Sequence, residues 1–293
     1  MGTTASSELN WRPLRGVDRL KLHEARLQAH HAVQWLARAA RAYIPPQPDD
    51  SHTSLHWDSA LDEFATQPFA RQTWLGLQIT TLTLVLHGAD GSAAVPTLAL
   101  SGHADTQARA WLGEQLARRG VDQSALDAPA PYEIPPHPVA RGAAYDAAAS
   151  AAALAELAAW YANAAVVLER VRAQLSKRVL SPSPLRCWPH HFDLATSTTL
   201  PTHSAGTAAS VGCGLSPGDE HYDEPYFYVS IYPDPPPSRL PPCPAPGHWH
   251  TRDFMAAVAT AQAITAAKNP PAEADGFLHD AVAIAVKLLA ETP

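Results

Sequence analysis

Apolar residues recur with two different periods along this chain, and the change of period separates the predicted helices from the predicted strands. Over residues 18–43 the apolar positions lie three or four apart, which is the spacing of one helix face. Pro45 and Pro46 follow and end this helix. We predict four further helices, at residues 105–119, 146–178, 251–267 and 275–291.

The period falls to two in the segments predicted to be strands. Alternation over residues 73–86 changes phase at Thr80–Thr81, which indicates a β-bulge or a bend in one long strand. The GADG turn at 88–91 then leads to a returning strand at 95–100. Three more strands are predicted, at residues 185–199, 207–214 and 225–232.

Helices that are separate from hairpin-connected strands define an α+β fold. We expect a mainly antiparallel sheet packed by several helices, of which the one at 146–178 is long. A single domain over residues 1–293 is the preferred organisation, and two subdomains divided near 129–142, where prolines cluster, are the alternative. No repeat with a period of 20–50 residues is visible.

Composition and charge exclude several classes of partner. The chain is 46% hydrophobic, as globular proteins are, and its net charge of −7 opposes binding to nucleic-acid phosphates. No apolar run approaches the ~20 residues that span a bilayer, and the N-terminus lacks the regions of an export signal. We therefore expect a cytoplasmic protein that binds neither nucleic acid nor membrane. An oligomer formed through the long helix is left open.

The three cysteines, Cys187, Cys213 and Cys243, have irregular spacing that suits neither a metal site nor a disulfide framework. We expect reduced thiols, as in cytosolic proteins. No glycine-rich phosphate loop is present, so no nucleotide cofactor is expected.

The densest chemistry lies in WPHHFDLAT, residues 188–196. If residues 190–195 are extended, Phe192 and Leu194 share one face and can reach the core. His191 and Asp193 then share the other face and project together toward a cavity or solvent.

Three neighbouring segments add polar and aromatic groups to this face. In YFYVSIY, Phe227, Val229 and Ile231 alternate with Tyr226, Tyr228 and Tyr232. In GHWH, two histidines two residues apart project the same way on an extended backbone, with Trp249 turned inward. Between WPHHFDLAT and YFYVSIY, the stretch LSPGDEHYDE contains SPGD, which fits a type II turn. This third segment brings in Asp219 and Glu224.

Each segment alone also has a structural interpretation. The histidine pair at 190–191 is compatible with an ordinary strand end, GHWH with the rim of a proline-rich loop, and SPGD with a common turn. The tyrosine face is compatible with sheet packing. Their shared strand phase, with ionisable groups opposite apolar ones, favours a site.

Four segments of this chain resemble a bacterial family, domain of unknown function 5996. They are PDDSHTSLHWD, CWPHHFDLAT, SVGCGLSPGDEHYDEPYFYV and PGHWHT, and the resemblance extends from near residue 30 to near residue 265. It implies that the four segments belong to one domain, and it supplies no activity. It also indicates His52, in the first of these segments, as a candidate site residue.

The first functional hypothesis is a metal-dependent, hydrolase-like enzyme acting on a small molecule, although enzyme activity itself stays open. Its ligands to a divalent metal would be His191, His248 and His250, with His52 and His190 in reserve. Zinc is the expected metal because histidine-rich tetrahedral sites are typical of it. The carboxylates available as ligand, orienting group or general base are Asp193, Asp219 and Glu224.

Two alternatives need no metal. In the first, the protein is a binding module whose pocket for a small ligand is lined by Tyr226, Tyr228 and Trp249. In the second, it is a structural or interaction protein that docks a partner through its proline-rich segment YPDPPPSRLPPCPAPG.

Overall fold

The structure is a computed structural model, and it describes residues 10–88, 95–177, 180–200 and 209–290. Most of the predicted GADG turn lies outside the described residues. The helices are α1 (Arg19–Tyr43), α2 (Asp105–Arg118), α3 (Ala151–Lys177), α4 (Ala261–Thr265) and α5 (Pro270–Ala290).

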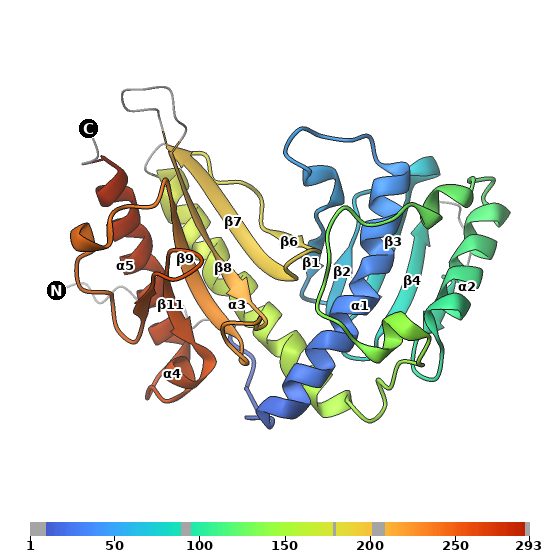
Figure 1. Ribbon diagram of the computed structural model, residues 1–293, viewed down its shortest axis with the longest axis horizontal. Coiled ribbons are helices and arrows are strands. Elements are labelled where there is room, and N and C mark those ends of the chain that lie inside the picture. Colours follow the sequence, from blue (N-terminus) through green and yellow to red (C-terminus); the bar gives the residue numbers. More distant parts are fainter. Residues whose placement is uncertain (1–9, 89–94, 178–179, 201–208, 291–293) are drawn as a thin grey trace.

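Two antiparallel sheets lie side by side and meet at strands β1 and β6 (Figure 1). The first sheet has the order β1 (His56–Asp58), β2 (Glu63–Ala65), β3 (Thr73–Gln78), β4 (Thr83–Gly88), β5 (Thr97–Ala99). The second has the order β10 (His248–His250), β11 (Ala256–Thr260), β9 (Tyr226–Tyr232), β8 (Ala209–Ser216), β7 (Asp193–Leu200), β6 (Arg186–Trp188). An antiparallel bridge between Leu55 and Cys187 joins them. The fold is therefore α+β, as predicted.

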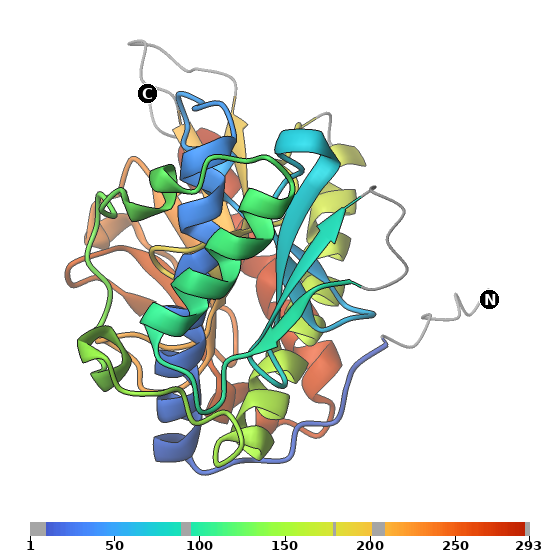
Figure 2. The ribbon, with the colours of Figure 1, turned by 90° about the vertical axis from the view of Figure 1, so that its right-hand side faces the viewer.

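Helix α1 begins where Asp18 caps it, because the Asp18 carboxylate accepts hydrogen bonds from the backbone N–H groups of Leu20 and Lys21. It ends at Tyr43, just before the proline pair. Seen from the right-hand side of Figure 1, α1 and α2 lie on the same side of strands β3 and β4 (Figure 2). The N-terminal half is thus a sheet with helices against one face.

Helix α3 is the central core helix. By length and composition alone it could cross a membrane, but 78% of its most apolar window is buried inside the molecule. It contacts α1, α5 and strands of both sheets. One main hydrophobic cluster accordingly contains residues of both sheets and of α1, α3 and α5.

The predicted core residues of the second sheet are buried. They are Phe192, Leu194, Phe227, Val229 and Ile231, each at most 2% exposed. Helices α3 and α5 pack on this sheet. The three cysteines are unpaired, also as predicted.

The two halves of the molecule share one order of elements. In each, a long helix (α1 or α3) precedes an antiparallel run of strands, and helices follow the last strand. The registers also correspond, since Ala65 pairs with Gly76 in the first sheet and Ala195 with Gly214 in the second. Strand β10 has no counterpart in the first half and extends the edge of the second sheet.

A buried carboxylic acid begins the second strand of each sheet. Glu63 starts β2 and is 2% exposed, and Asp193 starts β7 and is 8% exposed. The residue before each acid, Asp62 or Phe192, has a positive φ, 51° and 60° respectively. A left-handed residue thus ends the first turn of both sheets.

The phase change at Thr80–Thr81 arises from a turn between two strands. The prediction of one long strand over 73–86 is therefore wrong. Strands β3 and β4 form a hairpin whose closing residue, Leu82, has a φ of 47°. Periodicity cannot separate the two cases, because a four-residue turn and a bulge both shift the alternation.

The predicted strand 185–199 is also a hairpin, with β6 and β7 joined by the turn Pro189–Phe192. His191 lies in this turn and is exposed, and Phe192 is fully buried. The burial prediction is therefore correct, but the left-handed backbone of Phe192 produces it rather than strand alternation.

The predicted helix 251–267 is wrong over most of its length. Residues 256–260 form strand β11, which lies between β9 and β10, and only the short helix α4 follows. Alanine and valine in AAVAT are buried on both faces of the sheet, and a short apolar run of this kind has no diagnostic period. The last helix, α5, forms close to the predicted 275–291.

The β6–β7 turn is held by buried side chains of two helices. Nε2 of His30 and Nε2 of Gln34, both on α1, donate to the carbonyl oxygen of Pro189 at 2.9 and 2.8 Å. The Tyr161 hydroxyl on α3 donates to the carbonyl oxygen of Phe192 at 2.6 Å. The His30 ring also stacks on that of Phe192.

The buried His30 predicts a loss of stability in acid. Burial lowers the pKa of His30 to about 3, whereas an unfolded histidine titrates near ~6.5. Between these values the unfolded chain binds more protons, so stability falls as the pH falls, by up to about 1.4 kcal/mol per pH unit. His30→Gln removes this titration and keeps a donor for Pro189. Urea unfolding at about pH 7 and pH 4 should show a smaller loss in the variant, and equal losses would contradict the assignment.

Candidate functional site

A cavity of about 260 Å³ lies on the face of the second sheet opposite α3 and α5. Strand β9 contributes Tyr226 and Tyr228, and β7 contributes Asp193. Loops after β8 and β10 supply Asp219, His221 and Phe254. His191, from the β6–β7 turn, also lines the cavity. The structure thus brings together five of the predicted site residues: His191, Asp193, Asp219, Tyr226 and Tyr228.

Asp193 and Tyr228 form the most buried polar pair of this cavity. The Tyr228 hydroxyl donates to Oδ2 of Asp193 at 2.5 Å. The other carboxylate oxygen, Oδ1, is buried and has no hydrogen-bond partner among the described residues. An unpaired buried acceptor is unfavourable unless a ligand or a proton satisfies it.

The environment raises the pKa of both groups. Burial raises the pKa of Asp193, and the hydrogen bond from Tyr228 and the nearby His191 offset this only in part. Burial, together with the charge of Asp193, raises the pKa of Tyr228 well above its usual value. The proton between them therefore stays on the phenol.

A glycine makes room for this pair. A Cβ atom on Gly214 would lie 2.8 Å from the Tyr228 hydroxyl and 2.7 Å from the carbonyl oxygen of Leu194. Any side chain at this position would therefore displace Tyr228 from Asp193.

Asp219 organises the loop that follows β8. Its Oδ1 accepts the backbone N–H groups of His221 and Tyr222 at 2.8 and 3.0 Å, and its Oδ2 accepts the hydroxyl of Tyr226 at 2.5 Å. Burial and the Asp219 charge raise the pKa of Tyr226. The loop is thereby fixed against the tyrosine strand.

His248 and His250 converge on one hydroxyl group. The Tyr222 oxygen lies 2.8 Å from Nε2 of His248 and 2.9 Å from Nδ1 of His250. Nε2 of His250 donates to the carbonyl oxygen of Arg252, so Nδ1 is the acceptor of the Tyr222 proton and His248 donates to the same oxygen. Burial lowers the pKa of His248.

The predicted metal ligands are not gathered into one set. Across the described ranges, no group of three or more His, Cys, Asp or Glu side chains is arranged to hold a metal ion. His191 lines the cavity, whereas His248 and His250 are hydrogen-bonded to Tyr222. A zinc site would require rearrangement, and zinc stays a prediction.

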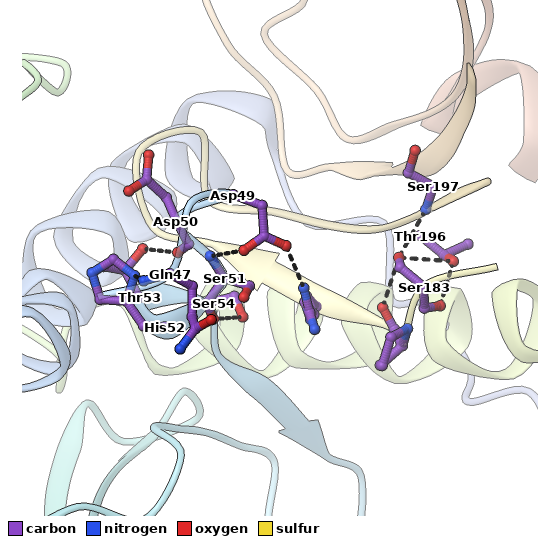
Figure 3. Close-up of polar contacts among 12 residues, drawn as sticks. Gln47, Asp49, Asp50, Ser51, His52, Thr53, Ser54, Ser183, Thr196 and Ser197 are labelled. Atoms are coloured by element: carbon purple, nitrogen blue, oxygen red, sulfur yellow. Dashed lines mark hydrogen bonds and ion pairs between the residues drawn. The ribbon is translucent and has the colours of Figure 1, made fainter. Parts of the chain in front are cut away.

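The reserve ligands lie outside the cavity lining. His52 is buried in the loop before β1, and its Nδ1 accepts the backbone N–H of Gln47 (Figure 3). In the same loop Asp49 forms an ion pair with Arg186 of β6 at 3.8 Å. His190 contacts the ring of Tyr132. The contact of His52 lies within the loop, and the ion pair of Asp49 connects this loop to the second sheet.

Glu224 and Trp249 also lie away from the cavity. One carboxylate oxygen of Glu224 accepts the backbone N–H of Gln262 in α4 at 2.7 Å, and the other pairs with Arg19 at 3.0 Å. The Trp249 indole donates to the carbonyl oxygen of Pro241 at 2.8 Å and packs against the main core. Both contacts are structural.

Sequence reasoning missed several lining residues because they lie in loops. Phe254 falls within the predicted helix 251–267, yet in the structure it lies in a loop and its ring stacks on that of His250 with centroids 4.1 Å apart. The His221 ring contacts both of these rings. Six histidines fall within residues 190–250, His221 among them, and this concentration is a sequence signal for the cluster.

The raised pKa of Asp193 predicts a stabilising substitution. Above the ordinary aspartate pKa of ~3.9, the folded protein retains a proton that the unfolded chain has lost, so stability decreases as the pH rises through the raised pKa. Asp193→Asn should increase the free energy of unfolding by about 1 kcal/mol at about pH 8 and change it little at about pH 4. Thermal melts at both pH values test this, with the exposed Asp234→Asn as control. A destabilised variant at the higher pH would contradict it.

Comparison with known proteins adds a family to this description. A model described as a family of unknown function (DUF5996) matches residues 21–290. No curated protein and no solved structure matches the chain. Because the family match covers nearly the whole sequence and all the elements that form the cavity, the chain belongs to the DUF5996 family.

Proposed function

We propose that this protein binds a small organic molecule in the cavity of the second sheet, and that Asp193 receives a hydrogen bond from its amino or hydroxyl group. The unpartnered Oδ1 of Asp193, buried at the wall of a 260 Å³ cavity, supports this most directly. Binding sites typically combine an apolar wall with a few placed polar groups. A ligand donor at this position would supply the missing hydrogen bond.

The lining indicates the chemical class of the ligand. Among the described residues it contains the carboxylates of Asp193, Asp219 and Glu220 and no lysine or arginine. Aromatic rings of Tyr226 and Phe254 provide flat apolar surface beside them. This combination suits an amine, through charge and cation–π contacts. The second ligand class that it suits is a polyhydroxylated molecule.

Acid–base catalysis is the second candidate function. A buried carboxyl group with a raised pKa, hydrogen-bonded to a tyrosine, is typical of general acids and bases. His191 faces the same cavity and can exchange protons with a ligand there. A metal-free enzyme would use these three side chains.

The metal-dependent hydrolase hypothesis is a separate proposal with its own measurement. In it, His191, His248 and His250 would bind zinc after Tyr222 has moved away. Elemental analysis of protein purified without a histidine tag would find about one metal ion per chain, in keeping with a single three-histidine site. Loss of that metal in His250→Ala would support the assignment.

Ligand binding is tested with NMR titration of the intact protein by a panel of small primary amines and polyols. We expect saturable binding of at least one compound. Tyr228→Phe should weaken it at least about tenfold, because Asp193 is no longer held in place and charge-assisted hydrogen bonds of this kind contribute ~1.5–3 kcal/mol.

The matched control is Tyr232→Phe, on the same strand and face but 59% exposed. It should leave the affinity unchanged. The absence of binding by any compound, or equal loss in both variants, would argue against this cavity as the ligand site.

A further inference from the structure

A second cavity, of about 190 Å³, lies between α1 and the proline-rich segment 130–140. Helix α1 contributes four polar side chains, His31, Gln34, Arg38 and Arg41, which are spaced three or four residues apart and so share one helix face. The segment contributes Tyr132, Ile134 and two alanines. The cavity shares no lining residue with the one on the second sheet.

The walls of this cavity are fixed by buried polar contacts. Nε2 of His31 donates to the carbonyl oxygen of Pro135 at 2.9 Å. The Tyr132 hydroxyl donates to Oε1 of Gln34 at 3.0 Å, and Nε2 of Gln34 donates to Pro189. His31 and Gln34 are both 8% exposed. The side chains of His31 and Gln34 form these hydrogen bonds within the protein, and the two arginines are therefore the groups available to bind a ligand.

Neither guanidinium group forms an ion pair with the residues that the structure describes. Arg41 donates one long hydrogen bond, 3.3 Å, to the Tyr132 hydroxyl, and its buried Nε has no partner in the described part of the chain. Arg38 stacks over the Trp35 ring, 4.4 Å from its centroid, and forms no hydrogen bond or ion pair with the described residues.

One carboxylate, that of Asp105, faces the two arginines across the cavity. Its Oδ1 accepts from the Trp35 indole at 3.2 Å and from the Tyr145 hydroxyl at 2.8 Å. Two guanidinium groups and one carboxylate give the lining a net positive charge in a chain whose total is −7. A half-buried arginine without an acceptor is unfavourable, and an incoming oxyanion would supply the acceptor.

We propose that this cavity binds the carboxylate or phosphate group of a small molecule, with Arg38 and Arg41 as the donors. The planar guanidinium group matches both oxyanions with two parallel N–H donors. Ile134 with the two alanines forms an apolar wall for the carbon atoms of the ligand.

The second cavity reaches the same turn as the first. The ring of Tyr132 lies 5.6 Å from that of His190, whose ring lies 4.3 Å from that of His191 in the first cavity. An anion bound by the arginines would therefore lie beside Tyr132, whose ring contacts His190 in the β6–β7 turn.

The probes for this site are inorganic phosphate and malonate, each titrated into the full chain at constant ionic strength. The readout is the set of arginine Nε–H signals in ¹⁵N-correlated NMR spectra. We expect saturable shifts for Arg38 and Arg41, and the probe with the higher affinity identifies the preferred oxyanion. Arg38→Gln and Arg41→Gln should each weaken binding at least about tenfold, as loss of a charge-assisted hydrogen bond predicts.

Arg118→Gln is the matched control, since it removes the same charge from an exposed ion pair on α2. It should bind both probes like the wild type. If an arginine variant fails to fold, Ala140→Trp at the exposed rim of the cavity should obstruct binding without disturbing the core. Shifts that do not saturate, or that are equal for Arg118, would overturn the proposal. So would unchanged affinity in Ala140→Trp.

Discussion

Side chains from two central helices hold the carbonyl groups of one four-residue turn, and the positions of His191 and Asp193 depend on it. His30 and Gln34 on α1 bind Pro189, while Tyr161 on α3 binds Phe192. The buried carbonyl groups need these donors because water cannot reach them. With the turn fixed, Phe192 enters the core, and the next residue, Asp193, is carried into the sheet as a buried acid.

Burial of that acid recurs in both halves of the molecule, which indicates a common architectural solution. Asp193 is held by Tyr228, and Glu63 in the first sheet pairs with His87 at 2.8 Å. In each pair the second carboxylate oxygen is buried and unpartnered within the described chain. Each acid also lies beside a strand glycine, where a Cβ atom would collide with the pair. The first half pairs its acid internally with a histidine, whereas the second half leaves its acid beside an open cavity.

The two proposed binding regions differ in the charge of their lining residues. The cavity of the second sheet is lined by carboxylates and tyrosines, and the cavity beside α1 by arginines. Both adjoin the histidines of the β6–β7 turn, one through His191 and the other through the contact of Tyr132 with His190. This arrangement would suit a ligand, or a pair of ligands, with a donor group at one end and an oxyanion at the other.

Periodicity and local chemistry determined the long helices, the tyrosine strand and its buried face, because these properties depend only on which residues alternate or recur. They also identified His191, Asp193, Asp219, Tyr226 and Tyr228 as members of one polar face. Only the tertiary structure decided that 189–192 is a turn and that 256–260 is a strand, since a left-handed residue and a doubly buried strand leave no periodic signal. Only tertiary contacts decided that His248 and His250 hydrogen-bond Tyr222. They also decided that Glu224 accepts a backbone N–H group at the start of α4. Which polar groups meet is set by packing between distant segments, and that information is absent from any local pattern.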